Sequence, residues 1–224
     1  MLVSVIIAPF DMLYLHIRAE RRREALRRET QARQSAEGRV PAAGDPWIRP
    51  ATPSDAARLR EIYGHYVTDT AITFEYDVPT LETFRRRVEN TLAKYPYLVL
   101  EADGAIQGYA YAGPFVGRAA YRRCCEVSIY LDRDARGRGY GRRLYEALEA
   151  ALRDRGILNL YACIADPLAE DETLTRASER FHRRLGYEKV GEFHKCGYKF
   201  DRWYNMIWME KLIGDHEDGR KSAE

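Results

Sequence analysis

The chain has 224 residues, 46% of them hydrophobic and 12% aromatic, which is enough to bury the core of one globular domain. Its 36 lysines and arginines nearly balance its 34 aspartates and glutamates, which argues against a polycation that coats nucleic acid. The four cysteines have neither CxxC pairs nor metal-ligand spacing, so we expect reduced thiols, no bound metal and a cytoplasmic protein.

The first 46 residues differ from the rest of the chain. Residues 1–17 are apolar, but Pro9 and Asp11 interrupt them and the run is shorter than the roughly 20 residues of a spanning helix. Arginines follow this run, whereas a signal peptide carries its charge before it; a signal anchor with its basic side in the cytoplasm stays an alternative. We predict an extension and linker over residues 1–46, one domain over 47–213 and a polar tail over 214–224, and we expect no membrane partner.

The domain opens with a short strand and two helices. The first helix starts after Thr52 with Pro53 and Asp55, which together are typical of a capped helix start. It carries one apolar stripe at helical spacing, made of Leu59, Ile62, Tyr63, Tyr66 and Val67. The second helix begins near Thr80 and ends before Pro96. A hairpin over residues 97–113 follows, with Asp103-Gly104 as its turn.

The second half continues with a strand at residues 126–131, EVSIYL, whose two faces differ chemically. After a glycine-rich stretch comes a helix with Leu144, Leu148, Ala151 and Leu152 predicted inside and Arg142, Glu146, Glu149 and Arg153 outside. Then follow a buried strand at 157–165, a helix at 171–186 and strands at 187–195 and 199–211. The order is βααβββαβαββ, a mixed α/β domain. We expect core positions for the aromatic residues Tyr109, Tyr111, Trp203, Tyr204 and Trp208.

The stretch ARGRGYGRRL, residues 135–144, places three glycines and several arginines at a helix start. A P-loop would need Gly-Lys-Ser/Thr, and a dinucleotide fingerprint would need GxGxxG; neither is present. The spacing Arg136-x-x-Gly139-x-Gly141 fits a third chemistry, a pyrophosphate held by loop amides at a helix amino terminus. A plain glycine turn with solvated arginines is the alternative.

These residues resemble a known family. Arg136-x-x-Gly139-x-Gly141 after EVSIYL resembles the acyl-CoA signature of the GCN5-related N-acetyltransferase (GNAT) family. Ser178-x-x-Phe181-His182-x-x-Leu185-Gly186-Tyr187 resembles the next motif of that fold. The segments IRPATPSDA, TFEY, GYAYAGPF, RAAY and YKFDRWYNMIWM are similar to the phosphinothricin acetyltransferase branch. The resemblance covers residues 47–213 and says nothing of residues 1–46.

The resemblance implies a fold and a co-substrate. The fold is α/β, with a mixed, mostly antiparallel sheet flanked by helices and a splayed strand pair that forms the acyl-CoA cleft. The backbone of Ile129 and Leu131 is expected to face acetyl-CoA, and the loop amides are expected to cradle its pyrophosphate. The implied cofactor-binding residues are Ile129, Tyr130, Leu131, Arg136, Gly137, Arg138, Gly139, Tyr140, Gly141 and Arg142.

Two residues are candidates for the chemistry. Glu126 stands just before the cofactor edge, where a carboxylate could take a proton from the attacking amine; an ordinary surface glutamate is the alternative. His182 matches the position where this branch places a proton donor for the leaving thiolate. We predict an inward stripe on this helix made of Leu174, Ala177, Phe181 and Leu185. A structural or solvent-facing histidine is equally consistent with the place of His182 one residue off that stripe.

On the substrate side the resemblance points to Phe74, Glu75, Arg118 and Tyr121. Arg118 could pair with a carboxylate or phosphinate, or it could be a surface arginine. The chain departs from the family near Thr175 or Ala177, where relatives usually carry an asparagine whose amide can contact the cofactor; this chain lacks that amide. Asp201 replaces a frequent glycine, but aspartate tolerates a left-handed turn.

We therefore expect an N-acetyltransferase acting on a small-molecule amine, an amino acid or a similar compound such as phosphinothricin or methionine sulfone or sulfoximine. A homodimer without a nucleic-acid partner is expected. The alternatives are acetylation of arylamines or protein amino termini, a catalytically silent CoA-binding sensor, and a nucleic-acid-binding module that uses Arg122, Arg123, Arg136, Arg138, Arg142 and Arg143.

Overall fold

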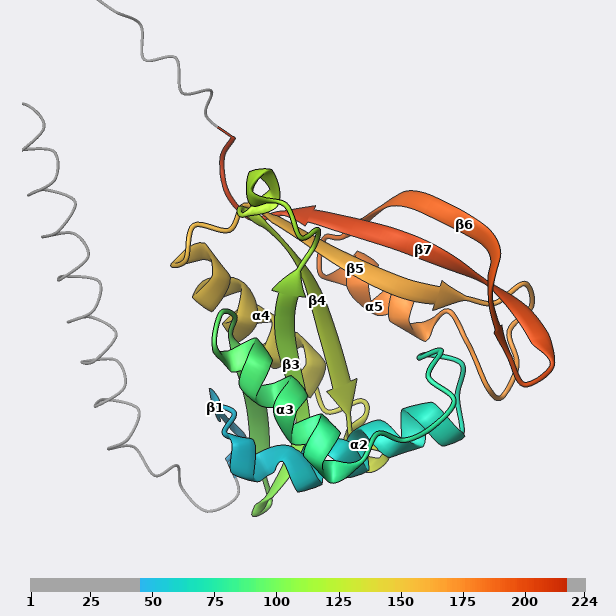
Figure 1. Cartoon of the computed structure of the whole chain (residues 1–224), viewed down its shortest axis with the longest axis horizontal. Coiled ribbons are helices and arrows are strands. Elements are labelled where there is room, and N and C mark those ends of the chain that lie inside the picture. The colour runs from blue at the N-terminus through green and yellow to red at the C-terminus, as the bar shows by residue number, and fades with distance from the viewer. Residues whose placement is uncertain (1–44, 217–224) are drawn as a thin grey trace, which may run out of the picture. The chain divides into compact units, whose positions relative to one another are not determined.

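A computed structural model describes residues 45–216 (Figure 1). The strands are β1 (Trp47–Pro50), β2 (Tyr97–Ala102), β3 (Ala105–Pro114), β4 (Cys124–Leu131), β5 (Asn159–Asp166), β6 (Glu188–Lys199) and β7 (Arg202–Leu212). The helices are α2 (Ala56–Thr68), α3 (Leu81–Leu92), α4 (Tyr140–Arg153) and α5 (Ala177–Arg184), with short 3-10 turns at Pro53–Asp55, Ala119–Tyr121 and Arg133–Ala135. The predicted order βααβββαβαββ is confirmed. The extension predicted over residues 1–46 lies almost wholly outside the described residues.

All seven strands form one sheet in the order β1-β2-β3-β4-β5-β7-β6. Five of its six strand pairs are antiparallel, and β4 and β5 alone are parallel. A parallel pair needs a crossover connection, which α4 supplies here. The predicted mixed, mostly antiparallel sheet is confirmed.

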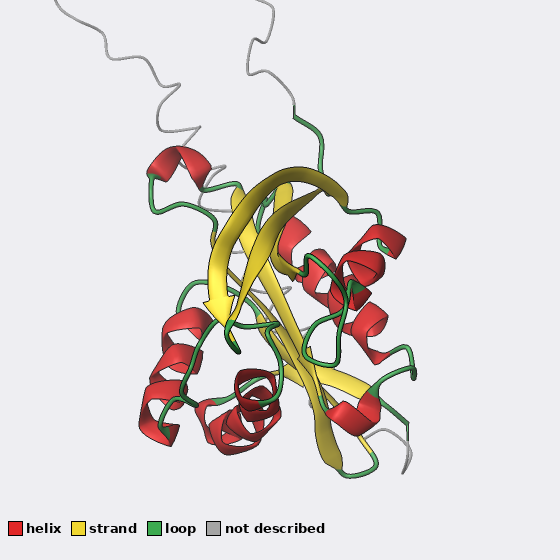
Figure 2. Cartoon of the chain, turned by 90° about the vertical axis from the view of Figure 1, so that its right-hand side faces the viewer, coloured by secondary structure: helices red, strands yellow, loops and turns green. Residues whose placement is uncertain are grey.

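Helices cover both faces of the sheet, as the edge-on view in Figure 2 shows. On one face α4 packs over β2, β3 and β4 and builds the larger core, in which Leu144, Leu148 and Leu152 are almost fully buried. On the other face α2 and α3 build a second core in which Leu59, Val67 and tyrosines from β2 and β3 are buried. Each core contains the strand side chains that point to its own face of the sheet, because successive residues of a strand point to opposite faces.

Local signals place the element boundaries as the sequence predicts. Thr52 and Asp55 form the capping box before α2, and the Thr80 side chain caps α3 by accepting a hydrogen bond from the Thr83 amide. The β2–β3 hairpin turns through two left-handed residues, with φ of 54° at Asp103 and 76° at Gly104. Asp201 also takes a left-handed φ, 57°, in the β6–β7 turn, so this departure from glycine is tolerated.

The structure also corrects several predictions. Glu149 is buried rather than outside, because Lys211 and Arg153 reach its carboxylate. The helix predicted at 171–186 forms only over Ala177–Arg184, and Ala177 is exposed rather than inside. The strand predicted at 187–195 runs on to Lys199 through a bulge. Trp203 is 52% exposed instead of lying in the core. None of the described helices is long and apolar enough to cross a membrane.

Candidate active site

The strands β4 and β5 part in the middle of the sheet. They pair only at Cys124↔Asn159, Cys125↔Leu160 and Glu126↔Tyr161, after which each strand runs on without the other. On their outer sides β4 stays paired to β3 and β5 stays paired to β7. The backbone edges that face each other beyond Glu126 therefore lack sheet partners, which is the splayed pair that the sequence predicts.

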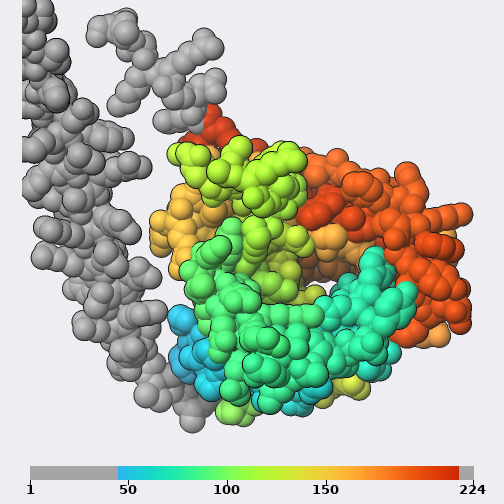
Figure 3. All heavy atoms as spheres, viewed as in Figure 1, coloured from blue at the N-terminus to red at the C-terminus, as the bar shows by residue number. Residues whose placement is uncertain are grey.

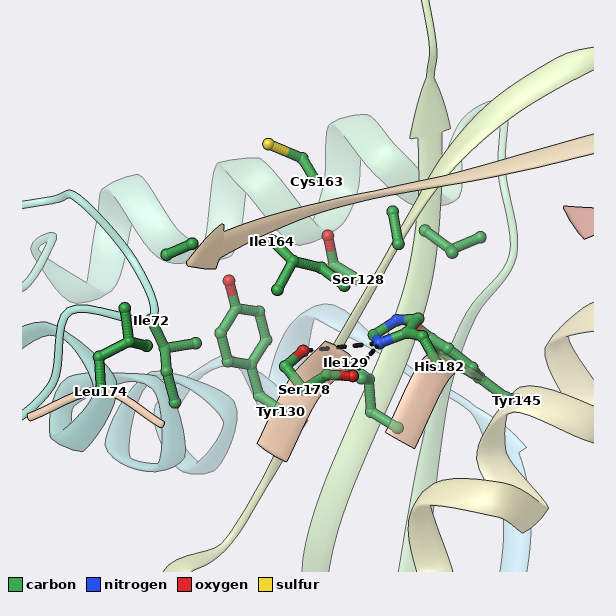
Figure 4. Close-up of a pocket in the computed structure, with 13 residues that line it drawn as sticks. Ile72, Ser128, Ile129, Tyr130, Tyr145, Cys163, Ile164, Leu174, Ser178 and His182 are labelled. Carbon is green, nitrogen blue, oxygen red and sulfur yellow. Dashed lines mark hydrogen bonds between the residues drawn. The ribbon is translucent and has the colours of Figure 1, made fainter. Parts of the chain in front are cut away.

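A cavity lies in this opening, and Figure 4 shows its lining side chains. Tyr145 of α4 and His182 of α5 lie at one end, and Ile72 and Leu174 lie at the other. The remaining lining comes mainly from β4 and β5: Val127, Ser128, Ile129, Tyr130, Ala162, Cys163, Ile164 and Ala165. The space-filling view shows a hollow on the α2–α3 face, bordered by the turquoise segment after α2, the yellow-green segment after β3 and the red β7 (Figure 3).

One backbone position on the open edge of β4 is already engaged. The Tyr66 hydroxyl accepts a hydrogen bond from the Leu131 amide at 3.1 Å and donates one to the Leu131 carbonyl at 2.7 Å. The Tyr66 hydroxyl thus occupies, in this structure, the Leu131 backbone groups that are expected to face acetyl-CoA. The amide and carbonyl of Leu131 point away from β3, and every second residue of an edge shares this direction. The backbone groups of Ile129, two residues earlier, therefore also point to the open side. Ile129 is the position that can take an extended ligand as a strand takes its neighbour.

The glycine-rich stretch forms the turn into α4, and its glycines have two different roles. Gly137 and Gly139 take left-handed φ values of 79° and 78°, with no described atom within 4 Å of an added Cβ. Gly141 is needed for close packing, because its Cβ would lie 3.1 Å from the Phe181 ring. The first helical hydrogen bond joins the Arg143 amide to the Gly139 carbonyl, so the preceding amides of α4 are free of helical partners. Open space above free amides at a positive helix end suits a pyrophosphate.

The arginines of this turn reach outward. Arg138 pairs with Asp103 at 3.1 Å, and the Arg136 guanidinium lies 5.9 Å from the centre of the Tyr66 ring. Arg136, Arg138 and Arg142 are exposed, so a bound anion can meet them from solvent. Tyr140 is buried in the core under α4, and only its amide can serve a ligand there.

Glu126 occupies the last paired position before the opening, next to the cavity-lining residue Val127 but outside the lining itself. It shares a face of β4 with Ser128 and Tyr130, and the Tyr130 ring packs edge-on against Tyr63 of α2 at 5.0 Å. The glutamate therefore faces the α2–α3 side of the sheet. Within residues 45–216 its carboxylate has no hydrogen-bond or ion-pair partner, and burial raises the pKa of Glu126. A partly buried, unpaired carboxylate is suited to accept a proton.

His182 is only 3% exposed, which excludes the solvent-facing alternative. Its Nδ1 lies 2.8 Å from the Ser178 carbonyl and its Nε2 lies 2.9 Å from the Tyr145 hydroxyl (Figure 4). A carbonyl can only accept, so Nδ1 carries the hydrogen and Nε2 accepts from Tyr145. Burial lowers the pKa of His182 to about 4, so the imidazole is neutral at pH 7.

The four predicted substrate-side residues lie outside the cavity lining. Phe74 and Glu75 belong to residues 69–80 between α2 and α3, which we call the acceptor-side segment. Phe74 packs on Gly197 and Tyr204, and Glu75 pairs with Arg87 at 2.8 Å. The other two, Arg118 and Tyr121, are exposed in the segment after β3. Both segments border the hollow seen in Figure 3.

The sequence prediction missed Tyr145 and Tyr66, both of which touch predicted site residues. Tyr145 has the same helical spacing as Leu148 and Leu152, so a polar-tipped aromatic in the inward stripe was the signal that could have revealed it. Tyr66 appeared only as a core position. The Tyr66 hydroxyl is hydrogen-bonded to the backbone of Leu131, 65 residues later in the chain, so no sequence pattern within either segment indicates the contact.

A family model described as an acetyltransferase (GNAT) domain matches residues 48–208, most of the chain. The chain belongs to the GNAT family. Within that family it falls in the branch similar to phosphinothricin N-acetyltransferases, and it is an acetyl-CoA-dependent N-acetyltransferase.

Two relatives of this GNAT enzyme are named for the small molecules that they acetylate. A phosphinothricin N-acetyltransferase of Streptomyces coelicolor is 33% identical over 178 residues, covering 78% of this chain and 100% of that protein. An L-methionine sulfoximine/L-methionine sulfone acetyltransferase of Salmonella typhimurium is 31% identical and covers 75% of this chain and 95% of that protein. The solved structure of yncA, a putative acetyltransferase from Salmonella typhimurium with its cofactor acetyl-CoA, superposes with a TM-score of 0.70 at 29% identity, covering 77% of this chain and 96% of that one.

Proposed function

We propose that this GNAT enzyme transfers the acetyl group of acetyl-CoA to the amine of an amino acid or a similar compound such as phosphinothricin or methionine sulfone or sulfoximine. The observation that carries the proposal is the unpaired, partly buried Glu126 at the point where β4 and β5 part. The names of the relatives support an amino-acid-like acceptor. We also propose a cytoplasmic homodimer.

Acetyl-CoA supplies the acetyl group as a reactive thioester. The free amides before Arg143 and the exposed arginines of the glycine turn are suited to its pyrophosphate, and the open edge at Ile129 is suited to its extended arm. Gly139 adopts a left-handed φ, which a glycine takes without strain, and it has no side chain that would block the approach to those amides.

Glu126 is proposed as the general base. An aliphatic amine with a pKa of about 10 is free base in about one part per thousand at pH 7, so the attacking nitrogen must lose a proton. Burial raises the pKa of Glu126, which makes its carboxylate a stronger base than an exposed glutamate. Its face of β4 is the α2–α3 side of the sheet, from which we propose that the amine enters.

His182 and Tyr145 are proposed to act as one unit at the end of the cavity that α4 and α5 form. The neutral imidazole holds the Tyr145 hydroxyl through Nε2, so Tyr145 is the group of this pair whose hydrogen can move. His182 itself is not a ready proton donor, because the buried imidazolium is unfavourable. In this structure the one hydrogen of the Tyr145 hydroxyl is donated to Nε2, so Tyr145 can donate to the leaving sulfur only when its bond to His182 breaks. We therefore expect the pair to have a smaller effect on rate than Glu126.

A turnover screen tests the proposed function. The full chain is assayed with acetyl-CoA against L-amino acids, phosphinothricin, methionine sulfone, methionine sulfoximine, arylamines and peptides, with release of free thiol as the readout. Preferred turnover of the amino-acid group supports the proposal. Preference for arylamines or peptide amino termini would replace the acceptor class. Binding of acetyl-CoA without turnover of any amine would favour the sensor alternative.

A further inference from the structure

One buried lysine is not used by the proposed chemistry. Lys199 is the last residue of β6 and is 3% exposed. Its Nζ donates to the carbonyls of Val67 at 2.7 Å, Thr70 at 2.8 Å and Thr73 at 2.8 Å. An ammonium group has three donors, and these three carbonyls use all of them.

The three carbonyls belong to the end of α2 and the beginning of the acceptor-side segment. The last carbonyls of a helix have no helical partner and carry the negative end of its dipole, so a cation is well placed beside Val67. Residues 69–80 contain no regular helix or strand of their own. The course of this segment therefore depends on contacts with other parts of the fold.

Other contacts hold the same segment to the end of the sheet. The Ala71 amide donates to the Thr173 carbonyl at 3.1 Å, and the Tyr76 hydroxyl donates to the Tyr198 carbonyl. The Phe74 ring lies so close to β6 that a Cβ on Gly197 would be 2.3 Å from it. Lys199 satisfies three carbonyls at once, and its contacts with Val67 and Thr70 are buried.

The held segment forms one end of the cavity. Ile72 lines the cavity, and it stands between Thr70 and Thr73, both of whose carbonyls bind Lys199. Phe74 and Glu75 follow directly, and the Glu75 carboxylate opposes the fall that burial causes in the pKa of Lys199. We propose that Lys199 is a positioning residue that fixes the acceptor-side segment as the wall of the amine site, an inference that rests on the proposed function of that site.

Methionine, arginine and glutamine would not fully replace the ammonium group of Lys199. Methionine has similar length but no donor, so it leaves the three carbonyls without their partner. Arginine spreads its donors over a planar fork, which does not match three acceptors that converge on one atom. Glutamine keeps two donors and should retain part of the contact.

The test compares Lys199→Met with Lys211→Met in the full chain. Lys211 of the adjacent strand β7 is a matched control, because its Nζ is also held at 2.8 Å, by the carboxylate of Glu149 in α4. In Lys199→Met we expect the KM for the acceptor amine to rise at least about tenfold, with the KM for acetyl-CoA changed less than about twofold. We expect intermediate values in Lys199→Gln. Lys211→Met should lose thermal stability without a change in either KM.

Amide hydrogen exchange gives a readout that does not depend on the acceptor. Lys199→Met should exchange faster over residues 69–80 and at the wild-type rate in α4. Wild-type acceptor KM and wild-type exchange in that segment would overturn the proposal. If Lys199→Met fails to fold, the same two measurements on Lys199→Gln decide. If no amine is turned over by the wild-type chain, the proposed function fails, while the exchange comparison still decides whether Lys199 holds the segment.

Discussion

Replacement of Glu126 by glutamine isolates the basicity of one carboxylate. The amide has the size of the carboxylate but cannot accept the proton of an ammonium group. Because no described residue is hydrogen-bonded or ion-paired to Glu126, the change breaks no contact within residues 45–216. A loss of rate in Glu126→Gln therefore reports on chemistry rather than on a lost structural bond.

The size of the expected loss follows from the amine and the site. At pH 7 about one part per thousand of an amine with a pKa of about 10 is free base, and a positioned general base contributes about a hundredfold or more. We expect kcat of Glu126→Gln to fall at least about a hundredfold, which corresponds to about 2.7 kcal/mol of activation free energy. The loss should shrink toward pH 9, because more of the amine arrives deprotonated. The KM for acetyl-CoA should change little.

The same replacement of Glu126 by glutamine should raise or preserve the stability of the fold while it lowers kcat. Burial raises the pKa of Glu126 above its unfolded value, so the ionised carboxylate opposes folding once the pH exceeds the folded pKa. We expect the Tm of Glu126→Gln at pH 8 to equal or exceed that of the wild type. Glu210→Gln is the control, because Glu210 pairs in β7 opposite Tyr161, the residue that pairs with Glu126. Initial rates from pH 6 to 9 and thermal melts measure both quantities; wild-type kcat across that range in the Gln variant would refute the base assignment.

Other perturbations address the remaining parts of the site. Burial lowers the pKa of His182 from 6.5 to about 4, so its neutral form contributes about 3 kcal/mol to the free energy of unfolding above pH 6.5, and this contribution is lost as the pH falls through 4. Denaturant melts of His182→Gln should therefore show a smaller loss of unfolding free energy between pH 7 and pH 4 than melts of the wild type. Equal losses would contradict the lowered pKa. Gly139→Val should raise the KM for acetyl-CoA at least about tenfold, about 1.4 kcal/mol, because its φ of 78° excludes a β-branched residue, whereas Gly113→Ala should be neutral; an unchanged KM in Gly139→Val would move the pyrophosphate site elsewhere. A chain that begins at Pro46 should keep full turnover, and its inactivity in the same assay would refute the proposed domain boundary.

The sequence by itself determined the order of the elements, most of their boundaries and the family. Capping boxes, turn glycines and apolar periodicity act within a few residues, so Thr52, Thr80 and Asp103 could be read directly. The glycine spacing after β4 likewise indicated a phosphate-binding helix start, because the left-handed residues and the free amides lie within one short segment.

Only the tertiary structure decided how distant segments meet at the site. Glu149 is buried because Lys211 lies beside it, although a helical pattern places it outside. His182 is neutral because the tertiary fold buries it, and its ring is held because Tyr145 on another helix donates to it. The Leu131 backbone is engaged because Tyr66 reaches it. These contacts join residues 37 to 65 positions apart in the chain, and a local pattern records the polarity of each residue but not its partner.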